Sequence, residues 1–530
     1  MAADSDADRA FVLGLDGVPW GMLRRWVEAG ELEHFGRLFE EGAAGPMQST
    51  TPATTPVAWP AIATGVTPDE HGIYAFRRLS PEYTHRMYTS GDLGRPPIWD
   101  LLSPAVVGNV PMTYPASDVD GAMVSGMMTP ERDEGFAHPS TLREEVADAI
   151  PDYRIELDWA EYDGSTGAFR DALSEMVAAR RELMRLLLDR EDWRLFFFVY
   201  TAPDRLQHLA WEEEVLLDHY RTLDEIVGEV MDRVAERDAT LYVVSDHGFG
   251  PVETVVNVNR LLADEGFLRY RDEGGVRGVL SQFDVSKERV LSALARVGLD
   301  EETLVDALPR GLVDGVAKQI PGDHVLYDVD YGETAAFVYG PGNLYVNDTE
   351  RFVDGAVAPG DVPGVKRELR ATLSDLTDPA TGEQVLRVSD GDELFPSDPR
   401  SPDLVVKGRE GYEVRTTVAD DVLGETGAMS ASHRPEGIFL AWGPSIEAGA
   451  VPADATVYDV LPTVLHGAGA PVPEHVTGDV LEVFAPDSPP AAAEVTTSAY
   501  DGAAAEGDAE AETGDYSEVE DRLRGLGYME

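Results

Sequence analysis

Short apolar runs alternate along the chain with longer segments in which apolar residues recur at helical spacing. The clearest runs predict strands at residues 11–15, 105–107, 195–200, 241–245, 404–406 and 438–442. Arginine-rich amphipathic helices are predicted between them, for example over 168–190 and 213–237. Apolar strands separated by helices are typical of a mostly parallel sheet covered on both faces. The pattern therefore predicts an α/β fold.

Three segments depart from this alternation. Residues 266–345 are charged, Gly-rich and poor in strand signals, which indicates an inserted cap. Residues 486–515 contain no Lys or Arg and are rich in Ala, Glu and Asp, which predicts an acidic disordered linker. Residues 516–530 carry a short amphipathic pattern able to pack against the body. The catalytic core is then expected to comprise 1–265 and 346–485.

The net charge indicates the partners and the solvent of the protein more than its fold. The 530 residues include 42 Lys and Arg against 98 Asp and Glu, a formal net charge of −56, and the acids are spread along the whole chain. Such a field repels nucleic-acid phosphates and anionic membrane surfaces. Distributed acidity favours adaptation to molar salt, in which charges are screened within a few Å.

The sequence lacks cysteine, and it also lacks a recognisable targeting signal or membrane segment. These two features limit the possible catalytic groups and the expected location. The chain has no cysteine, which excludes disulfides, thiolate metal sites and cysteine nucleophiles. Its first residues are acidic and resemble no targeting signal, and its apolar runs are too short to span a bilayer. We therefore expect a cytoplasmic protein without a membrane segment or a nucleic-acid-binding surface.

Residues able to bind metals follow three of the predicted strands. Asp16 follows the first, Asp204 and His208 follow the strand at 195–200, and Asp246 and His247 end the strand at 241–245. Asp and His at i and i+4 of a helix face the same way and can share one ion. Taken singly, Asp16 also fits a strand-end turn, and the Asp-His pair also fits a surface contact.

A cluster of hydroxyl groups precedes a short helix of small residues that ends at Gly65. Thr54 and Thr55 stand directly before Pro56, where a hydroxyl either caps the helix or serves as a nucleophile near its amino end. His433 lies just before the predicted strand at 438–442 and means little alone.

In this order the motifs resemble the alkaline phosphatase superfamily and, within it, the type I phosphodiesterase/nucleotide pyrophosphatase branch. The matching motifs are Leu15-Asp16-Gly17, Thr64-Gly65 with Pro68 and His71-Gly72-Ile73, Asp204-x-x-x-His208, Ser245-Asp246-His247-Gly248 and His433. The segments 109–115 and 123–130 are similar to prokaryotic members, and the resemblance covers roughly residues 10 to 480. It implies an alkaline-phosphatase-like sheet and a small phosphate ester or diester as substrate.

The resemblance also implies a mechanism with two divalent metal ions, Zn²⁺ or alternatively Mn²⁺, and a covalent phospho-threonine. One ion is assigned to Asp16, Thr55, Asp246 and His247. The other is assigned to Asp204, His208 and His433. Thr55 is the expected nucleophile because Gly65 follows it at the family spacing of ten residues. Pro56 comes one residue earlier than the family usually has it, which leaves Thr54 as the alternative.

Several readings stay open beside the hydrolase. A phosphotransferase or phosphomutase of the same superfamily is one, and a non-catalytic metal-binding relative is another. Sulfatases and alkaline phosphatases proper are disfavoured because their Cys or Ser nucleophile and nearby Arg are missing. The Asn-His pair of animal nucleotide pyrophosphatases is replaced by Val57-Ala58-Trp59. Trp59 either lines a leaving-group pocket or belongs to the core, and Asn109 either faces the phosphate or shapes a turn.

Overall fold

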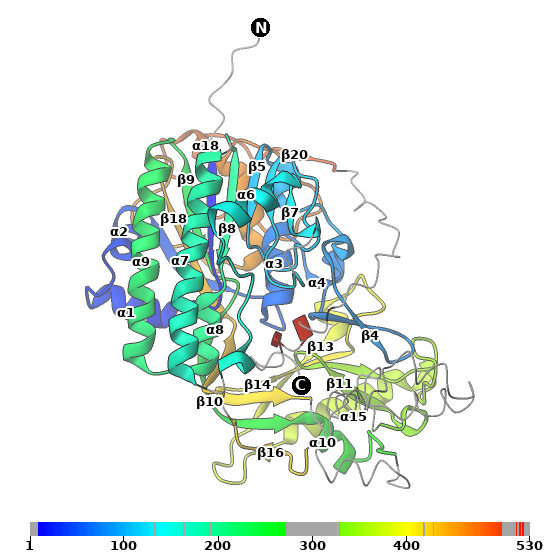
Figure 1. Ribbon diagram of the computed structural model, residues 1–530. Helices are drawn as coiled ribbons and strands as arrows, with labels where there is room; N and C mark the ends of the chain where they lie inside the picture. Colours follow the sequence, from blue (N-terminus) through cyan, green and yellow to red (C-terminus); the bar gives the residue numbers. More distant parts are fainter. Residues whose placement is uncertain are drawn as a thin grey trace, which may run out of the picture.

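The computed structural model describes residues 9–130, 134–162, 165–190, 192–271, 326, 329–416, 419–427, 429–500, 516, 519–520 and 522–523. Its larger lobe is built on an eight-stranded sheet with the order β2-β18-β9-β1-β8-β5-β6-β7 (Figure 1). These strands are β1 (Ala10–Leu15), β2 (Ala43–Gln48), β5 (Ala105–Gly108), β6 (Gly121–Val124), β7 (Ala137–His138), β8 (Leu195–Tyr200), β9 (Thr240–Val244) and β18 (Glu436–Trp442). The strands from β9 to β6 run parallel, whereas β18 and β7 are antiparallel to their neighbours. The predicted mostly parallel α/β sheet is confirmed.

Alternating residues of the central strands build a separate core on each face of this sheet. In β1, Phe11 and Leu13 point into one core and Val12 into the other. In β8, Phe196 and Phe197 divide in the same way. This explains why the strands read as continuous apolar runs, since both faces are removed from water.

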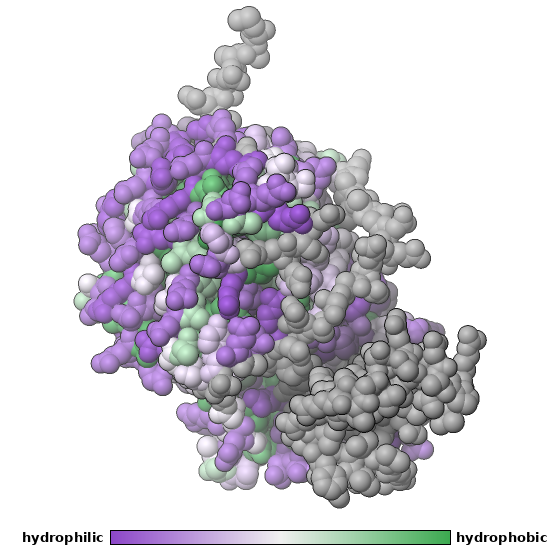
Figure 2. Space-filling view, viewed as in Figure 1, coloured by the Kyte–Doolittle hydropathy of each residue, from purple (hydrophilic) through white to green (hydrophobic). Residues whose placement is uncertain are grey.

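Helices cover both faces. The first core packs under α1 (Trp20–Glu28), α2 (Glu33–Glu41), α6 (Thr141–Ala149), α7 (Thr166–Arg190) and α9 (Glu213–Ala235). The second packs under α3 (Thr55–Thr64), α5 (Ile98–Leu101) and α17 (Val460–Gly467). Hydrophilic residues dominate the face of the larger lobe on which α7 and α9 lie, in keeping with the acidic composition (Figure 2).

A second, smaller lobe lies below the larger one in Figure 1 and has a core of its own. Its four-stranded sheet has the antiparallel order β11 (Ala336–Tyr339), β12 (Asn343–Val346), β14 (Leu404–Gly408) and β13 (Leu386–Asp390). Helices α10 (Val258–Asp264) and α15 (Val362–Asp375) pack on it. The long strand β10 (Gly248–Asn257) leads into this lobe from the larger one and pairs with β15 (Gly411–Arg415), β16 (Leu423–Gly424) and β17 (Ala431–Arg434).

The second sheet changes the interpretation of one predicted strand. Residues 404–406 do form a strand, but as β14 they belong to the second sheet rather than to the main one. Leu404 and Val406 face the core of the smaller lobe while Val405 faces away from it. The short apolar run is therefore a strand with buried residues on both of its faces. The sheet pairs 336–346 with 386–408 across the expected boundary at residue 345. Residues 272–325 of the expected cap lie outside the described residues.

The chain past residue 486 differs in part from the expected linker. Residues 486–500 contain α18 (Pro489–Ala492) and β20 (Thr497–Ser498), which pairs with β19 (Val472–Pro473). The ring Nε2 of His466 lies 2.9 Å from the carbonyl oxygen of Pro490 and ties this segment to α17. Residues 501–515 lie outside the described residues.

Beyond that gap, Val519 and Leu523 are buried beside Ile73 and Phe76, which follow the short helix α4 (Pro68–His71), and beside Met87 of β4 (His85–Met87), the strand that pairs with β3 (Arg77–Leu79). They join a cluster that includes Met112, Met127 and Met128. Within the described part of the chain, every helix is too short or too polar to cross a bilayer.

Candidate active site

Polar side chains from distant parts of the sequence meet at the carboxyl ends of β1, β8 and β9. This group, called the site cluster below, comprises Asp16, Thr55, Asp204, His208, Asp246, His247 and His433. Six of the seven residues are buried and His433 is partly buried. Open α/β sheets bind ligands at this edge. The structure thus brings together all seven residues that the resemblance assigned to the metals.

Asp16 stands at a tight turn directly after β1. Its Oδ2 accepts a 3.0 Å hydrogen bond from Nε1 of Trp59. The next residue, Gly17, has a φ of 74°, and its N–H donates to Oδ1 of Asp246 at 3.2 Å. A Cβ at Gly17 would lie 3.1 Å from the Cβ of Asp204. The left-handed turn and the close approach of these carboxylates both require glycine here.

Thr55 is the first residue of α3, and its hydroxyl points into the cluster. Oγ1 lies 3.2 Å from Nε2 of His247 and donates to Oδ1 of Asp16 at 3.4 Å. Thr54 precedes the helix in an extended conformation, and its hydroxyl has no hydrogen-bond partner among the described residues. The positive end of the dipole of α3 favours negative charge on an oxygen placed there. Of the two hydroxyl groups, that of Thr55 is therefore the one with polar neighbours in the site cluster.

His247 presents one defined nitrogen to the cluster. Its Nδ1 lies 3.1 Å from the carbonyl oxygen of Gly248, which can only accept, so Nδ1 carries the proton. Nε2 then offers a lone pair. It lies 3.2 Å from Oδ2 of Asp246. It also lies 3.7 Å from Asp16 Oδ1 and 3.9 Å from Asp204 Oδ1.

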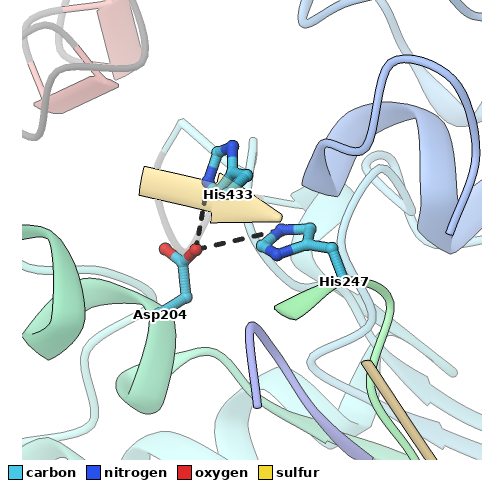
Figure 3. A group of neighbouring side chains, drawn as sticks. All are labelled: Asp204, His247 and His433. Carbon is cyan, nitrogen blue, oxygen red and sulfur yellow. Dashed lines mark ion pairs between the residues drawn. The ribbon is translucent and has the colours of Figure 1, made fainter. Parts of the chain in front are cut away.

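The other side of the cluster is built by α8 (Ala202–Leu209) and β17. Asp204 and His208 lie one helical turn apart, with Oδ1 and Nε2 separated by 3.7 Å. Nε2 of His433 lies 3.3 Å from Asp204 Oδ1 and 3.1 Å from His208 Nε2. His433 is held there because it pairs with Phe249 in the ladder of β17 and β10. Asp204, His247 and His433 point toward one another (Figure 3).

Burial sets the electrostatics of these groups. It raises the pKa of Asp16, and the nearby Asp246 and Asp204 raise that pKa further. Burial and Asp204 also raise the pKa of Asp246. Burial lowers the pKa of His208 to about 3 and that of His247 well below its usual range. Crowded carboxylates beside neutral imidazoles form a site that a cation would stabilise.

The donor set fits divalent metal ions. Asp16, Asp246 and His247 form one group of potential ligands, and Asp204, His247 and His433 form another. Within each group the ligand atoms lie within 4.8 Å of one another. The buried Oδ2 of Asp246 accepts no hydrogen bond from the described residues. Carboxylate oxygens and imidazole nitrogens without thiolates suit Zn²⁺ or Mn²⁺. His247 lies between the groups, whereas the resemblance had assigned it to one ion.

An arginine behind the cluster was missed by the sequence analysis. Nη1 of Arg205 donates to Oδ2 of Asp204 at 2.9 Å, and its Nε donates to Glu156 at 3.0 Å. Glu156 also lies 3.4 Å from Arg180, and all three residues are buried. Arg205 could have been found from the sequence, because it directly follows the proposed ligand Asp204. Glu156 lies in a loop far away in sequence and had none.

Trp59 and Asn109 take the second of the two positions that the sequence left open for each, the core for Trp59 and a turn for Asn109. Trp59 is wholly buried in the second core, so it orients Asp16 from behind instead of facing a substrate. Asn109 follows β5 with a φ of 58° and is also buried. Its side-chain oxygen accepts a hydrogen bond from the hydroxyl of Tyr153. The positive φ of Asn109 belongs to this turn, because asparagine adopts the left-handed conformation more readily than most residues.

The sheet order and the cluster at its carboxyl edge define an alkaline-phosphatase-like α/β protein. The chain belongs to the type I phosphodiesterase / nucleotide pyrophosphatase family, whose model matches residues 10–435. It is therefore a hydrolase of the phosphodiesterase or pyrophosphatase type. The predicted family is confirmed.

Three solved structures are similar to the chain, and the first of them supports the fold. Human ectonucleotide pyrophosphatase / phosphodiesterase 5 is 12% identical with a TM-score of 0.50, covering 90% of this chain and 100% of the other. The murine protein is 14% identical with a TM-score of 0.46, over the same shares of the two chains. An inactive variant of the murine protein in complex with AMP is 13% identical, with a TM-score of 0.46 and the same coverage. No curated protein sequence matches the chain significantly.

Proposed function

We propose that the chain is a dimetal-dependent phosphodiester hydrolase that works through a covalent phospho-threonine on Thr55. One observation carries this proposal. The Thr55 hydroxyl begins a buried helix and lies 3.2 Å from His247 and 3.4 Å from Asp16, inside a cluster of carboxylates and imidazoles. Neither a helix cap nor a core threonine needs such neighbours.

The site cluster would hold two divalent ions, Zn²⁺ or alternatively Mn²⁺. Asp16, Thr55, Asp246 and His247 are the proposed ligands of one ion. Asp204, His208 and His433 are the proposed ligands of the other. When bound, such ions lower the pKa of a ligating hydroxyl and neutralise charge on the phosphate and on the departing oxygen.

The residues of the chain then define the order of events. Thr55 Oγ1 gives up its proton and attacks phosphorus in line, so that the Oγ1–P bond of the phospho-threonine forms as the bond from phosphorus to the ester oxygen breaks, and the departing oxygen takes up a proton and leaves as the alcohol. Water enters from the side that the alcohol vacated, breaks the Oγ1–P bond and restores the hydroxyl. The positive end of α3 stabilises negative charge on Oγ1 in both steps. Phosphoryl transfer depends mainly on positioning and charge, which a rigid buried cluster supplies.

The test compares a diester with its monoester. Hydrolysis of bis(4-nitrophenyl) phosphate and 4-nitrophenyl phosphate is measured in molar KCl with Zn²⁺ or Mn²⁺ and again with EDTA. We expect diester cleavage that EDTA abolishes and that Thr55→Ala lowers by about 10³-fold or more, since the nucleophile is lost. Thr54→Ala is the matched control and should retain activity. Full activity of Thr55→Ala, or two bound ions without turnover of either ester, would contradict the hydrolase mechanism.

We also infer that the protein is a prokaryotic-type member of its family adapted to molar salt. The excess of 98 acidic over 42 basic residues supports this, because mutual repulsion between them is strongest in dilute buffer. The melting temperature should rise steadily between 0.1 M and 3 M KCl. A melting temperature that stays constant over this range would contradict salt adaptation.

A further inference from the structure

One face of strand β14 is turned toward the larger lobe. Leu404 and Val406 point into the core of the second lobe, so Val405 and Lys407 lie on the opposite face. Val405 packs with Tyr74, which follows α4 in the larger lobe. Asn343, the partner of Val405 in β12, donates to the carbonyl oxygen of Tyr74 at 3.0 Å. Lys407 is therefore the next residue along a face that packs on the larger lobe.

Lys407 also lies within electrostatic reach of the site cluster. The following strand, β15, pairs with β10, and β10 pairs with β17, which carries His433. Burial lowers the pKa of His433, and the charge of Lys407 is the next largest cause. Burial lowers the pKa of His247 most, and Lys407 adds to that effect. The rings of His433 and His247 lie against each other, with centroids 4.2 Å apart, so both lie near the same ammonium group.

The two lysines in the described part of the chain have different surroundings. Lys366 forms ion pairs with Asp390 at 3.0 Å and Asp392 at 2.6 Å. The side chain of Lys407 makes no ion pair or hydrogen bond with any residue that the structure describes. Burial lowers its pKa, and the carboxylate of Glu413 only partly opposes this. A half-buried ammonium without a partner is costly to maintain.

Arg434, the residue after His433, already interacts with other protein atoms. Nη1 of Arg434 donates to the carbonyl oxygen of His433 at 2.9 Å and lies 3.8 Å from Oε2 of Glu413. Nη2 of Arg434 donates to the carbonyl oxygen of Pro251 at 2.8 Å. Arg434 is thus fixed by protein atoms, whereas Lys407 has no such partner among the described residues and is able to meet a ligand. A compact ammonium suits an anionic oxygen approached from any direction.

We propose that Lys407 forms an anion subsite on the second lobe that binds a second anionic group of the substrate, a phosphate or a carboxylate beside the scissile phosphodiester. The inference rests on the proposed function, because it places that phosphodiester on Thr55. It makes the second lobe a determinant of specificity. The preferred substrates are then diesters in which one ester group carries a negative charge of its own.

Three 4-nitrophenyl phosphodiesters that differ only in the second ester group test this subsite. The groups are n-propyl, 2-carboxyethyl and 2-(phosphonooxy)ethyl. For the native chain we expect kcat/KM for at least one charged diester to exceed that for the propyl diester. Lys407→Gln should lower this charged-to-propyl ratio by about tenfold, mainly through KM, since a charge-assisted contact is lost. Lys407→Arg should retain most of the preference, and the charged group with the larger effect identifies the natural anion.

Lys366→Gln is the matched control because it removes the same charge from the same lobe. The subsite is refuted if Lys407→Gln leaves the ratio within twofold of the native value, or if Lys366→Gln lowers it equally.

Measuring the binding of phosphates that are not cleaved tests the subsite separately from the proposed hydrolase function. Dissociation constants of n-propyl phosphate and 2-carboxyethyl phosphate are measured by calorimetry on the metal-loaded protein. A native preference for the carboxylate that Lys407→Gln removes supports the subsite even if no diester is cleaved. Diester cleavage with equal binding of both phosphates, in native and variant proteins alike, refutes the subsite and leaves the hydrolase standing.

Discussion

Replacing Trp59 with Phe should weaken metal binding without touching any ligand. The indole Nε1 donates to Asp16 Oδ2 at 3.0 Å inside a site from which water is excluded. A hydrogen bond to a buried charged group contributes about 1.5–3 kcal/mol, or roughly a 10- to 100-fold change in an equilibrium constant. Changes in the residues that orient metal ligands cost about 10- to 100-fold in affinity in other sites. We therefore expect Zn²⁺ affinity at the Asp16 side of the cluster to fall by that factor.

The loss of Zn²⁺ affinity in Trp59→Phe should also depend on pH in a defined direction. Burial raises the pKa of Asp16, Asp246 and Asp204 raise it further, and the hydrogen bond from Trp59 lowers it. Without that bond the proton competes more strongly with the metal, because a ligand must bind as a carboxylate. The deficit in Zn²⁺ affinity should therefore grow as the pH falls, and the acidic limb of the activity profile should move to higher pH.

The assay is a Zn²⁺ titration against a competing chelator at several pH values. Trp99→Phe is the matched control. Trp99 is buried in the same core as Trp59 and packs edge-on against the same Phe197, at 6.1 Å compared with 6.2 Å. Its Nε1 has no hydrogen-bond partner among the described residues. Equal losses of affinity in the two variants, or a change within twofold in Trp59→Phe, would refute the positioning role.

Two further predictions concern stability. Glu156→Gln should cost about 3–5 kcal/mol in urea unfolding at pH 7, because two buried arginines lose their carboxylate. Burial alone would raise the pKa of Glu156, but Arg205 and Arg180 hold it lowered from 4.5, so the deficit should shrink as the pH falls below 4.5 through the folded pKa. A deficit independent of pH would contradict this. Val519→Asp and Leu523→Asp should each lower the melting temperature, since each removes a buried side chain contributing about 1.5–3 kcal/mol. An unchanged melting temperature would show that this packing contributes nothing.

The main sheet and the ligands could be predicted because both have local signals in the sequence. A central strand buried on both faces reads as an uninterrupted apolar run, and the polar residues that directly follow this run fall at the ligand-binding edge. Asp16 and Asp246 are found by this rule alone. The choice between Thr54 and Thr55 needed more than local pattern. Spacing favoured Thr55, and the structure supports it by its distance to His247.

The second lobe escaped prediction for a physical reason. The strands of its sheet are only four or five residues long, and β13 is mostly half-buried, so they are hard to distinguish from a loop with occasional apolar residues. Its sheet also joins residues that are far apart, with 343–346 pairing directly with β14 across a gap that holds α15 and β13. Sequence pattern carries no information on such pairings.

The same distinction separates residues that do chemistry from residues that choose the substrate. Four of the proposed metal ligands, Asp16, Asp204, Asp246 and His247, follow parallel strands of the main sheet within a few residues, and His208 lies one helical turn beyond Asp204, so the fold itself gathers them. Lys407 lies within electrostatic reach of the cluster because β14 contacts β15 and β15 pairs with β10, which continues into the larger lobe. A change in that lobe can therefore alter which ester binds while Thr55 and its neighbours keep their geometry. The Lys407→Gln and Trp59→Phe variants separate these roles, since the first should change the preference among diesters and the second should change the affinity for metal.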